Sequence, residues 1–370
     1  MKVSYVNGIC VKNDAISNSI RDEVRALRKS GVDDVRLYAY ACEYDDIPST
    51  VVSEVRDIAF DPHFLASDVV IFHFGIYYPL FDLLSIVPAR ARRLVVFHNV
   101  TPREFVKPES RALIDQSFSQ MSNIAWADHV ICVSDTNLEV LRKAGIDTPA
   151  TVLPLAIHSM SHPPSRKPSV VDNIVRIAFI GRFVKSKGPH ELLMALSNVL
   201  ASNPTCAVKL DMVGNLLFSD PELLAQIETI IATLARQYGR RVEIKIHGNA
   251  SEEQKHEILQ DADLFVLPTY HEGFGVPIVE AISNGCYVIA YDNSNVPSVT
   301  NGFGRLVNTG CIDSLSAELA QAVEKVVSAA WRGSGDESYQ TFVTHATRYA
   351  EEFSPGRVAR NFVNLVSKIQ

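Results

Sequence analysis

One stretch of the chain indicates the fold most clearly: Val175-Arg176-Ile177-Ala178-Phe179-Ile180-Gly181-Arg182-Phe183-Val184-Lys185-Ser186-Lys187-Gly188. Its first six residues are mostly apolar and predict a buried strand, and the remainder predicts a loop that opens a helix from about Pro189 to Leu200. Similar short apolar runs alternate with helical patterns along the whole chain. These runs are rich in Val, Ile and Leu without polar alternation, which is typical of parallel strands covered on both faces.

The predicted strands fall into two sets, one in each half of the chain. They are Lys2–Val6, Val35–Tyr40, Val69–His73, Leu94–His98, His129–Val133 and Thr151–Leu153, followed by Val175–Ile180, Val208–Val213, Val242–Ile246, Leu264–Leu267, Tyr287–Ala290 and Gly304–Val307. Alternation of strands with helices predicts an α/β fold with two doubly wound domains. A proline- and serine-rich stretch without periodicity predicts a linker over residues 159–173, between domains at 1–158 and 174–353. A C-terminal helix, 354–370, is expected to return to the first domain.

Composition and charge exclude several classes of protein. The 370 residues carry a formal charge of −7, which disfavours a general nucleic-acid binder, so no nucleic-acid partner is expected. The N-terminal residues do not resemble a signal peptide, and no apolar run reaches the ~18 residues of a membrane-spanning helix. The six cysteines are widely spaced and show no metal-binding pattern. We therefore expect a cytoplasmic protein with reduced thiols.

The strongest candidate for a ligand-binding segment is His271-Glu272-Gly273-Phe274-Gly275-Val276-Pro277-Ile278-Val279-Glu280-Ala281, which follows an expected strand. Gly273 and Gly275 let the backbone approach a ligand closely, and the amides at the start of the following helix favour an anion. Glu272 and Glu280 can accept hydrogen bonds from hydroxyl groups but repel phosphate. Together these features indicate a ligand with phosphate and polyol parts, such as a sugar nucleotide; the alternative is a glycine-rich turn with a surface glutamate.

Two cations follow the first strand of the second half. Arg182 can bridge two phosphate oxygens with its fork, while Lys187 acts as a point charge. Both lie at the carboxyl end of a strand, where ligands bind in open α/β sheets. The alternative is an ordinary solvated basic turn, and Lys185 is expected to face solvent.

In the first half, His98 follows a strand directly and could exchange hydrogen bonds with a sugar hydroxyl. The competing interpretation is that His98 only makes hydrogen bonds within its own loop. His73, at the end of the neighbouring strand, is a weaker candidate for contact with a sugar hydroxyl. The patterns HExxH, GxGxxG after a strand, GxxxxGK[ST] and GxSxG are absent. A DxD triplet, Asp261-Ala262-Asp263, closes an expected helix and is interpreted as structural, so no metal is expected.

These residues resemble the glycosyltransferase family 4 enzymes, which are retaining and have the GT-B fold of two Rossmann-like domains facing across a cleft. The resemblance rests on the G-R-x4-K-G segment Gly181–Gly188 and on the E-x7-E motif from Glu272 to Glu280, and covers about Val175 to Val307. His98-Asn99-Val100-Thr101-Pro102 is similar to a segment in bacterial polysaccharide-assembly members, several of which are mannosyltransferases.

The resemblance implies roles for individual residues. Arg182 and Lys187 would hold the donor diphosphate, Glu272 would contact the donor sugar, and His98 would approach that sugar from the other domain. The remaining donor-binding positions are Gly8, Gly181, Gly248, Gly273, Phe274, Gly275, Val276 and Glu280, with Glu280 on the ribose and the segment Ile246–Asn249 near the base. Many members carry a Gly-Gly loop after the first strand, where this chain has Asn7-Gly8.

The implied function is transfer of a hexose, with mannose favoured, from a nucleotide diphosphate sugar to a hydroxyl of a glycan or polyprenyl-linked acceptor in surface polysaccharide synthesis. GDP-mannose is the first expected donor and a UDP-sugar the second, with no cofactor besides this co-substrate. An anionic membrane surface, at the inner face of the membrane, is a candidate partner for two basic clusters: Arg21, Arg25, Arg28 and Lys29, and Arg90, Arg92 and Arg93. The alternative is that both clusters are ordinary solvated faces. A sugar-nucleotide epimerase and a non-catalytic scaffold are the alternatives.

Overall fold

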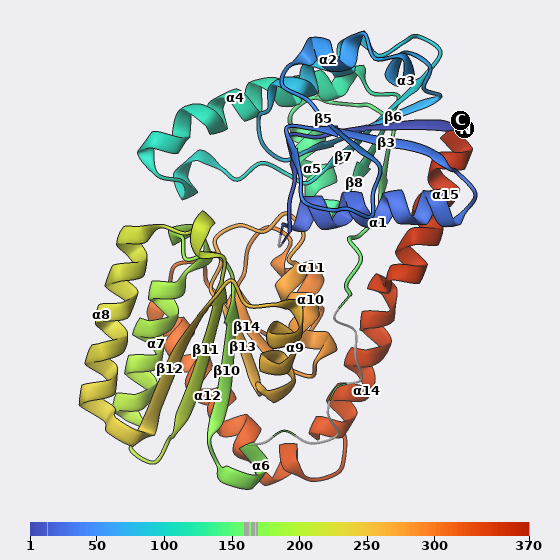
Figure 1. Ribbon diagram of the computed structural model, residues 1–370. Coiled ribbons are helices and arrows are strands. Elements are labelled where there is room, and N and C mark those ends of the chain that lie inside the picture. The colour runs from blue at the N-terminus through green and yellow to red at the C-terminus, as the bar shows by residue number, and fades with distance from the viewer. Residues whose placement is uncertain (13, 159–162, 164–166, 168, 370) are drawn as a thin grey trace. The chain divides into compact units, whose positions relative to one another are not determined.

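The computed structural model describes residues 1–12, 14–158, 163, 167 and 169–369 (Figure 1). The chain forms two compact units: unit 1 comprises Met1–Ala156 with Phe353–Gln370, and unit 2 comprises Ile157–Glu352. Of the predicted linker, residues 159–162, 164–166 and 168 lie outside the described residues, and Ser169–Asp172 form a short helix, α6. Among the described residues, no helix combines the length and apolar character needed to cross a membrane.

Unit 1 contains a sheet of seven parallel strands in the order β5-β3-β1-β6-β7-β8-β9. In chain order these strands are β1 (Lys2–Val6), β3 (Asp34–Ala39), β5 (Ser49–Val51), β6 (Val69–Phe74), β7 (Arg92–Phe97), β8 (His129–Cys132) and β9 (Ala150–Val152). The six predicted strands are confirmed, each within two residues at either end. The three-residue β5 and the pair β2 (Ile9–Cys10) and β4 (Ala41–Cys42) were not predicted, because such short runs carry no periodicity.

The helices of unit 1 cover this sheet (Figure 1). The principal ones are α1 (Ala15–Lys29), α2 (Val55–Ala59), α3 (Pro62–Leu65), α4 (Arg111–Met121), α5 (Asp135–Lys143) and α15 (Pro355–Ile369). Helix α1 begins after Asp14, whose side chain accepts a hydrogen bond from the Ser17 amide. The C-terminal helix α15 packs against α1 and buries Phe362 and Val366, so its return to the first domain is confirmed.

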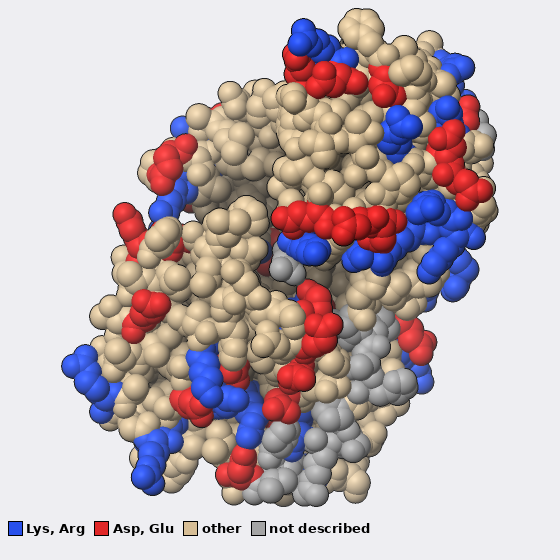
Figure 2. Space-filling model, viewed as in Figure 1, with Lys and Arg blue, Asp and Glu red and all other residues tan. Residues whose placement is uncertain are grey.

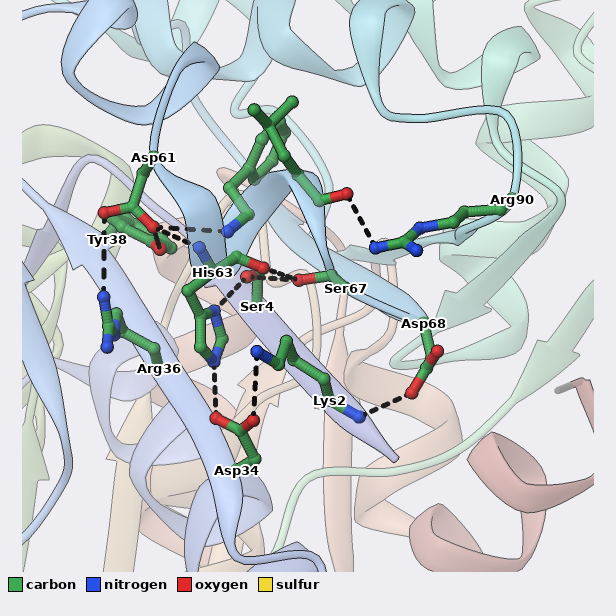
Figure 3. Close-up of polar contacts among 12 residues, drawn as sticks. Lys2, Ser4, Asp34, Arg36, Tyr38, Asp61, His63, Ser67, Asp68 and Arg90 are labelled. Carbon is green, nitrogen blue, oxygen red and sulfur yellow. Dashed lines mark hydrogen bonds and ion pairs between the residues drawn. The ribbon is translucent and has the colours of Figure 1, made fainter.

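A buried histidine ties the first strands of unit 1 together (Figure 3). The His63 ring lies between Ser4 and Asp34, with Nδ1 3.1 Å from the Ser4 hydroxyl and Nε2 2.9 Å from the Asp34 carboxylate. Ser67 extends the network, because its hydroxyl lies 2.8 Å from that of Ser4. Burial, together with the nearby Arg36, lowers the pKa of His63.

Acidification is expected to destabilise unit 1 in part through His63. The pKa of His63 in the folded protein lies below the unfolded value of about 6.5. As the pH falls through that value, the unfolded chain therefore takes up a proton at His63 before the folded protein does, and the free energy of unfolding decreases. The urea midpoint should therefore fall less between about pH 7.5 and about pH 5.5 in His63→Gln than in the wild type. His345→Gln, which removes an exposed histidine, serves as the control. Equal falls in wild type and His63→Gln would contradict the prediction.

Unit 2 contains a sheet of six parallel strands in the order β12-β11-β10-β13-β14-β15. The strands are β10 (Val175–Ile180), β11 (Val208–Gly214), β12 (Val242–Gly248), β13 (Leu264–Leu267), β14 (Tyr287–Tyr291) and β15 (Gly304–Val307). All six were predicted within two residues. The chain order along the sheet reverses between β10 and β13, which is the switch point where open α/β sheets bind ligands.

The helices of unit 2 range from four to 18 residues in length. Those used below are α7 (Pro189–Ser202), α8 (Pro221–Tyr238), α9 (Glu252–Asp261), α10 (Val276–Ser283), α11 (Val296–Thr300), α12 (Ile312–Val327) and α14 (Tyr339–Ala350), and α13 (Ala329–Arg332) is a single turn. Helix α7 packs against α8 and α12, whereas α10 packs against α11 and α14. This packing holds the amino ends of α7 and α10 next to the strands that they follow.

Candidate active site

The loops after β10 and β13 form one hydrogen-bonded assembly at the switch point of unit 2. The amide of Tyr270 and the hydroxyl of Thr269 both donate to the carbonyl of Ser186, at 2.8 and 3.2 Å. Gly188 makes this approach possible, because a Cβ atom there would lie 2.1 Å from the carbonyl oxygen of Pro268. Its φ of +68° also lies in the left-handed region, which favours glycine.

Gly188→Ala is expected to destabilise unit 2 and weaken ligand binding, because it combines left-handed strain with a backbone clash. Gly302→Ala is the matched control: its φ is +82°, but no described atom lies within 4 Å of the added Cβ. The control should lose about 1–2 kcal/mol of unfolding free energy from strain alone, and Gly188→Ala should lose clearly more. Urea denaturation measures both, and equal losses would contradict the argument.

Lys187 and Glu272 form an ion pair across these two loops. The Nζ atom of Lys187 lies 2.6 Å from Oε1 of Glu272 and 3.4 Å from the carbonyl oxygen of His271. Their side chains are only 17% and 9% exposed, so the pair is largely shielded from water. Arg182, in contrast, is exposed and makes no ion pair with any residue that the structure describes. The site therefore holds one lysine that is already paired and one arginine available to an anionic ligand.

The start of α10 is held by Gly275 and by two residues that the sequence analysis did not identify, Ser294 and Asn295. Gly275 caps this helix at a φ of +101°. The Asn295 side chain donates to the Phe274 carbonyl at 2.7 Å, and the Ser294 hydroxyl accepts from the Glu272 amide at 2.9 Å. Both come from the loop after β14, and polar residues at the end of that strand were the signal that could have found them.

The predicted residues of this segment differ in exposure. Phe274 is buried, whereas Gly273 and Val276 are partly exposed. The early amides of a helix lack intrahelical partners and favour anions. The structure thus brings Arg182, Lys187, Glu272 and the amino end of α10 to one edge of the sheet.

Glu280 lies deeper than the sequence analysis expected. It is 5% exposed, and its Oε1 atom lies 2.8 Å from Nζ of Lys255 on α9. The same amine lies 2.7 Å from the exposed Glu252. Lys255 thus holds the Glu280 carboxylate in place, and no sequence signal marks it, because the two residues are 25 positions apart.

Glycines at the ends of β10, β11 and β12 bring these strand ends close together. A Cβ atom on Gly214 would lie 2.5 Å from the carbonyl oxygen of Gly181. Gly248 pairs in register with Gly214, and a Cβ atom there would lie 2.4 Å from the Leu216 side chain. Asn249 continues the contact, with its amide donating to the Gly214 carbonyl. Gly181 and Gly248 therefore stand at the same edge as the cations.

In unit 1, His98 follows β7 and contacts His73, the weaker candidate. Nε2 of His98 lies 2.9 Å from Nδ1 of His73, and the two rings stack with centroids 5.1 Å apart. Nε2 of His73 lies 3.1 Å from the Glu23 carboxylate. Burial lowers the pKa of His98, and the neighbouring His73 lowers it further by a smaller amount. Gly8, the other predicted residue in unit 1, follows β1, and its carbonyl accepts from the Tyr40 amide.

The DxD triplet begins at Asp261, the last residue of α9, and ends at Asp263, directly before β13. The Asp263 carboxylate accepts hydrogen bonds from the Arg176 amide at 2.8 Å and from the Ser169 hydroxyl, and it is 3% exposed. Burial raises the pKa of Asp263. These contacts support the structural interpretation of the triplet. In the described part of the chain, no group of three or more His, Cys, Asp or Glu side chains could hold a metal ion.

The two basic clusters are engaged with the protein itself. On α1, Arg21 and Arg25 lie 2.9 and 2.6 Å from the Asp46 carboxylate. Arg93 pairs with Asp128, and Arg90 donates to a backbone carbonyl. In Figure 2, red and blue atoms lie next to one another where α1 runs. These contacts engage Arg21, Arg25, Arg90 and Arg93, for which the sequence analysis gave an anionic membrane surface as a candidate partner.

Comparisons with known proteins indicate the family that this chain resembles. Residues 165–330 match the family model for Glycosyl transferases group 1, which confirms the resemblance to glycosyltransferases. The chain is 28% identical over 179 residues to a D-inositol 3-phosphate glycosyltransferase of Rhodococcus erythropolis, covering 48% of this chain and 38% of that protein. It is 31% identical over 81 residues to the O-antigen chain mannosyltransferase B of Escherichia coli, covering 22% of this chain and 21% of that protein. The chain thus spans about two fifths or less of the length of these curated relatives.

The fold agrees over a greater length. A glycosyltransferase from Rickettsia africae superposes with a TM-score of 0.75 at 14% identity, covering 100% of this chain and 98% of that one. The architecture is therefore that of the GT-B fold, with two Rossmann-like units.

Proposed function

We propose that this protein is a retaining glycosyltransferase that moves a hexose from a nucleotide diphosphate sugar to a hydroxyl group. The observation that carries the proposal is the Lys187–Glu272 ion pair beside the exposed Arg182, at the switch point of unit 2. Cations for a diphosphate and a carboxylate for sugar hydroxyls stand within one hydrogen-bonded pair of loops. The match to the group 1 family over 165–330 covers the same residues.

The proposed mechanism relies on positively charged groups that the fold already holds at the site. As the bond between the sugar and the diphosphate breaks, negative charge grows on the departing phosphate. Arg182, Lys187 and the amides at the start of α10 stabilise this charge, and such preorganised groups contribute about 2.7–4 kcal/mol each. The acceptor hydroxyl attacks from the same face of the sugar, and its proton passes to the departing phosphate, so that the anomeric configuration is retained.

The remaining residues orient the donor. We assign Glu272 to the donor sugar and Glu280, held by Lys255, to the ribose hydroxyls. The Gly273–Val276 backbone contacts the sugar hydroxyls and phosphate, Gly181 and Gly8 lie along the donor, and Gly248 borders the base. We assign His98 to a hydroxyl of the donor sugar. GDP-mannose is the first candidate donor, supported by the His98–Pro102 segment and by the match to a mannosyltransferase, and a UDP-sugar is the second. The proposed acceptor is a glycan or a polyprenyl-linked sugar of surface polysaccharide synthesis.

The test combines binding with product analysis. Thermal shifts with GDP, UDP and ADP, and then with the matching sugar nucleotides, identify the base; saturation at about 100 times Kd adds about 2.7 kcal/mol of stability. NMR of the selected donor, with and without acceptor glycans, then separates transfer from epimerisation. Stabilisation by one nucleotide, followed by transfer with retained configuration, supports the proposal. Binding of none of the three, or conversion of donor in the absence of any acceptor to its epimer, overturns it.

Turnover is expected to be unchanged in excess EDTA. The reason is that Arg182, Lys187 and the α10 amides supply the positive charge that a divalent cation provides in metal-dependent transferases. Initial rates with and without chelator, after removal of bound metals, measure this directly. Loss of activity that returns on adding Mg²⁺ or Mn²⁺ would contradict the prediction.

A further inference from the structure

Three side chains of unit 1 form a hydrogen-bonded row that ends at His98. Glu23 on α1 lies 3.1 Å from Nε2 of His73 on β6, and Nδ1 of His73 lies 2.9 Å from Nε2 of His98 after β7. The His73 side chain is fully buried and that of Glu23 is 12% exposed. A carboxylate, a buried imidazole and a partly exposed imidazole therefore lie in sequence from the helix to the strand ends.

The donors and acceptors in this row can be assigned from its first member. The Ser19 hydroxyl donates to Oε1 of Glu23 at 2.9 Å, and Oε2 of Glu23 is then the acceptor for an Nε2–H of His73. A neutral His73 protonated at Nε2 carries a lone pair on Nδ1. His98 must therefore donate through Nε2–H, which leaves its own Nδ1 as an acceptor.

The surroundings hold both rings in place. The Tyr78 hydroxyl donates to the His73 carbonyl at 2.7 Å, and the rings of His73 and His98 are within 23° of parallel. The His98 amide donates to the Phe74 carbonyl at 2.8 Å. Gly75 fits closely here, because a Cβ atom there would lie 3.3 Å from Cβ of His98. These contacts fix the backbone from which both rings project, and the hydrogen bonds along the row place the ring nitrogens.

We infer that Glu23 and His73 are positioning residues that hold His98 as the Nε2–H tautomer, so that its Nδ1 accepts a hydrogen bond from a donor-sugar hydroxyl. No described residue makes a hydrogen bond to Nδ1 of His98, which is consistent with an acceptor kept for a ligand. The assignment to a sugar hydroxyl rests on the proposed function, whereas the tautomer rests on the row alone. An imidazolium at His73 would instead require His98 to be protonated at Nδ1.

Nitrogen-15 NMR of histidine-labelled protein tests the tautomer without any substrate. At about pH 8, the His98 ring, assigned by comparison with His98→Asn, should show a protonated Nε2 and an unprotonated Nδ1. Glu23→Met removes the acceptor but keeps an unbranched side chain of similar length, and it should shift His98 toward a mixture of tautomers. Glu23→Gln keeps a carbonyl oxygen and should restore the wild-type pattern. Glu139→Met, on the exposed face of α5, is the control.

Kinetics supply the second readout. Glu23→Met should lower kcat/KM for the donor by about tenfold to a hundredfold, the size of effect seen when the partner that orients a metal-binding histidine is removed, while Glu23→Gln recovers most of it. Protonation of wild-type His98 at Nδ1, or an unchanged His98 pattern in Glu23→Met, overturns the inference, as does unchanged kcat/KM in Glu23→Met. If the spectra are as expected but the protein shows no transferase activity, the proposed function is refuted and the tautomer assignment remains supported.

Discussion

Arg182→Ala is expected to lower turnover by about two to three orders of magnitude, with little change in stability. Arg182 is exposed and makes no ion pair with any described residue, so its loss leaves no uncompensated charge in the fold. In the proposed transition state it faces the growing charge of the departing diphosphate. A guanidinium can meet two phosphate oxygens at once, which alanine cannot replace.

The measurement is kcat at saturating donor, alongside the melting temperature. Lys185→Ala is the matched control, because Lys185 is an exposed cation three residues away in the same loop. It should keep near wild-type turnover if position, rather than local positive charge, matters. Arg182→Lys should recover only part of the rate, because a point charge lacks the fork. Wild-type turnover in Arg182→Ala would show that this loop does not stabilise the departing diphosphate.

Lys187→Ala is expected to lower both turnover and stability. Turnover should fall by about two to three orders of magnitude for the same reason as at Arg182. Stability should fall by about 3 kcal/mol, because the 9% exposed Glu272 side chain loses the cation that lies 2.6 Å away. The two effects have different causes, and a second substitution separates them.

The double variant Lys187→Ala with Glu272→Ala makes this separation. Removing both partners removes the uncompensated carboxylate, so the urea midpoint should recover toward the wild-type value while turnover stays low. Glu252→Ala, which removes an exposed partner of Lys255, controls for loss of a surface carboxylate. Recovery of turnover in the double variant would contradict the proposed roles of both Lys187 and Glu272. No recovery of stability would show that the pair is not coupled.

The strands and the main chemical segments could be predicted from the sequence because their signals are local. Continuous apolar runs such as Val175–Ile180 predict strands covered on both faces, and all twelve predicted strands are present within two residues. Cations and carboxylates that directly follow strands predict a site at one sheet edge, since carboxyl ends of parallel strands meet there. Arg182, Lys187 and Glu272 each follow a strand in this way, so the sequence predicts that they lie at the same edge.

The tertiary structure alone decided which of these charged groups are already paired. Glu280 contacts Lys255, the arginines of α1 converge on Asp46, and Glu23 reaches His98 through His73. Each partner is distant in sequence and carries no pattern of its own.

Local sequence patterns are therefore sufficient to predict the two parallel sheets and the chemistry available at their edges. The fold decided the partners and the exposure of each group, and hence which carboxylate is held and which nitrogen is left as an acceptor. The physical reason is that periodicity and loop chemistry are properties of neighbouring residues, whereas a hydrogen bond or ion pair depends on distances of about 3 Å between side chains that only packing brings together.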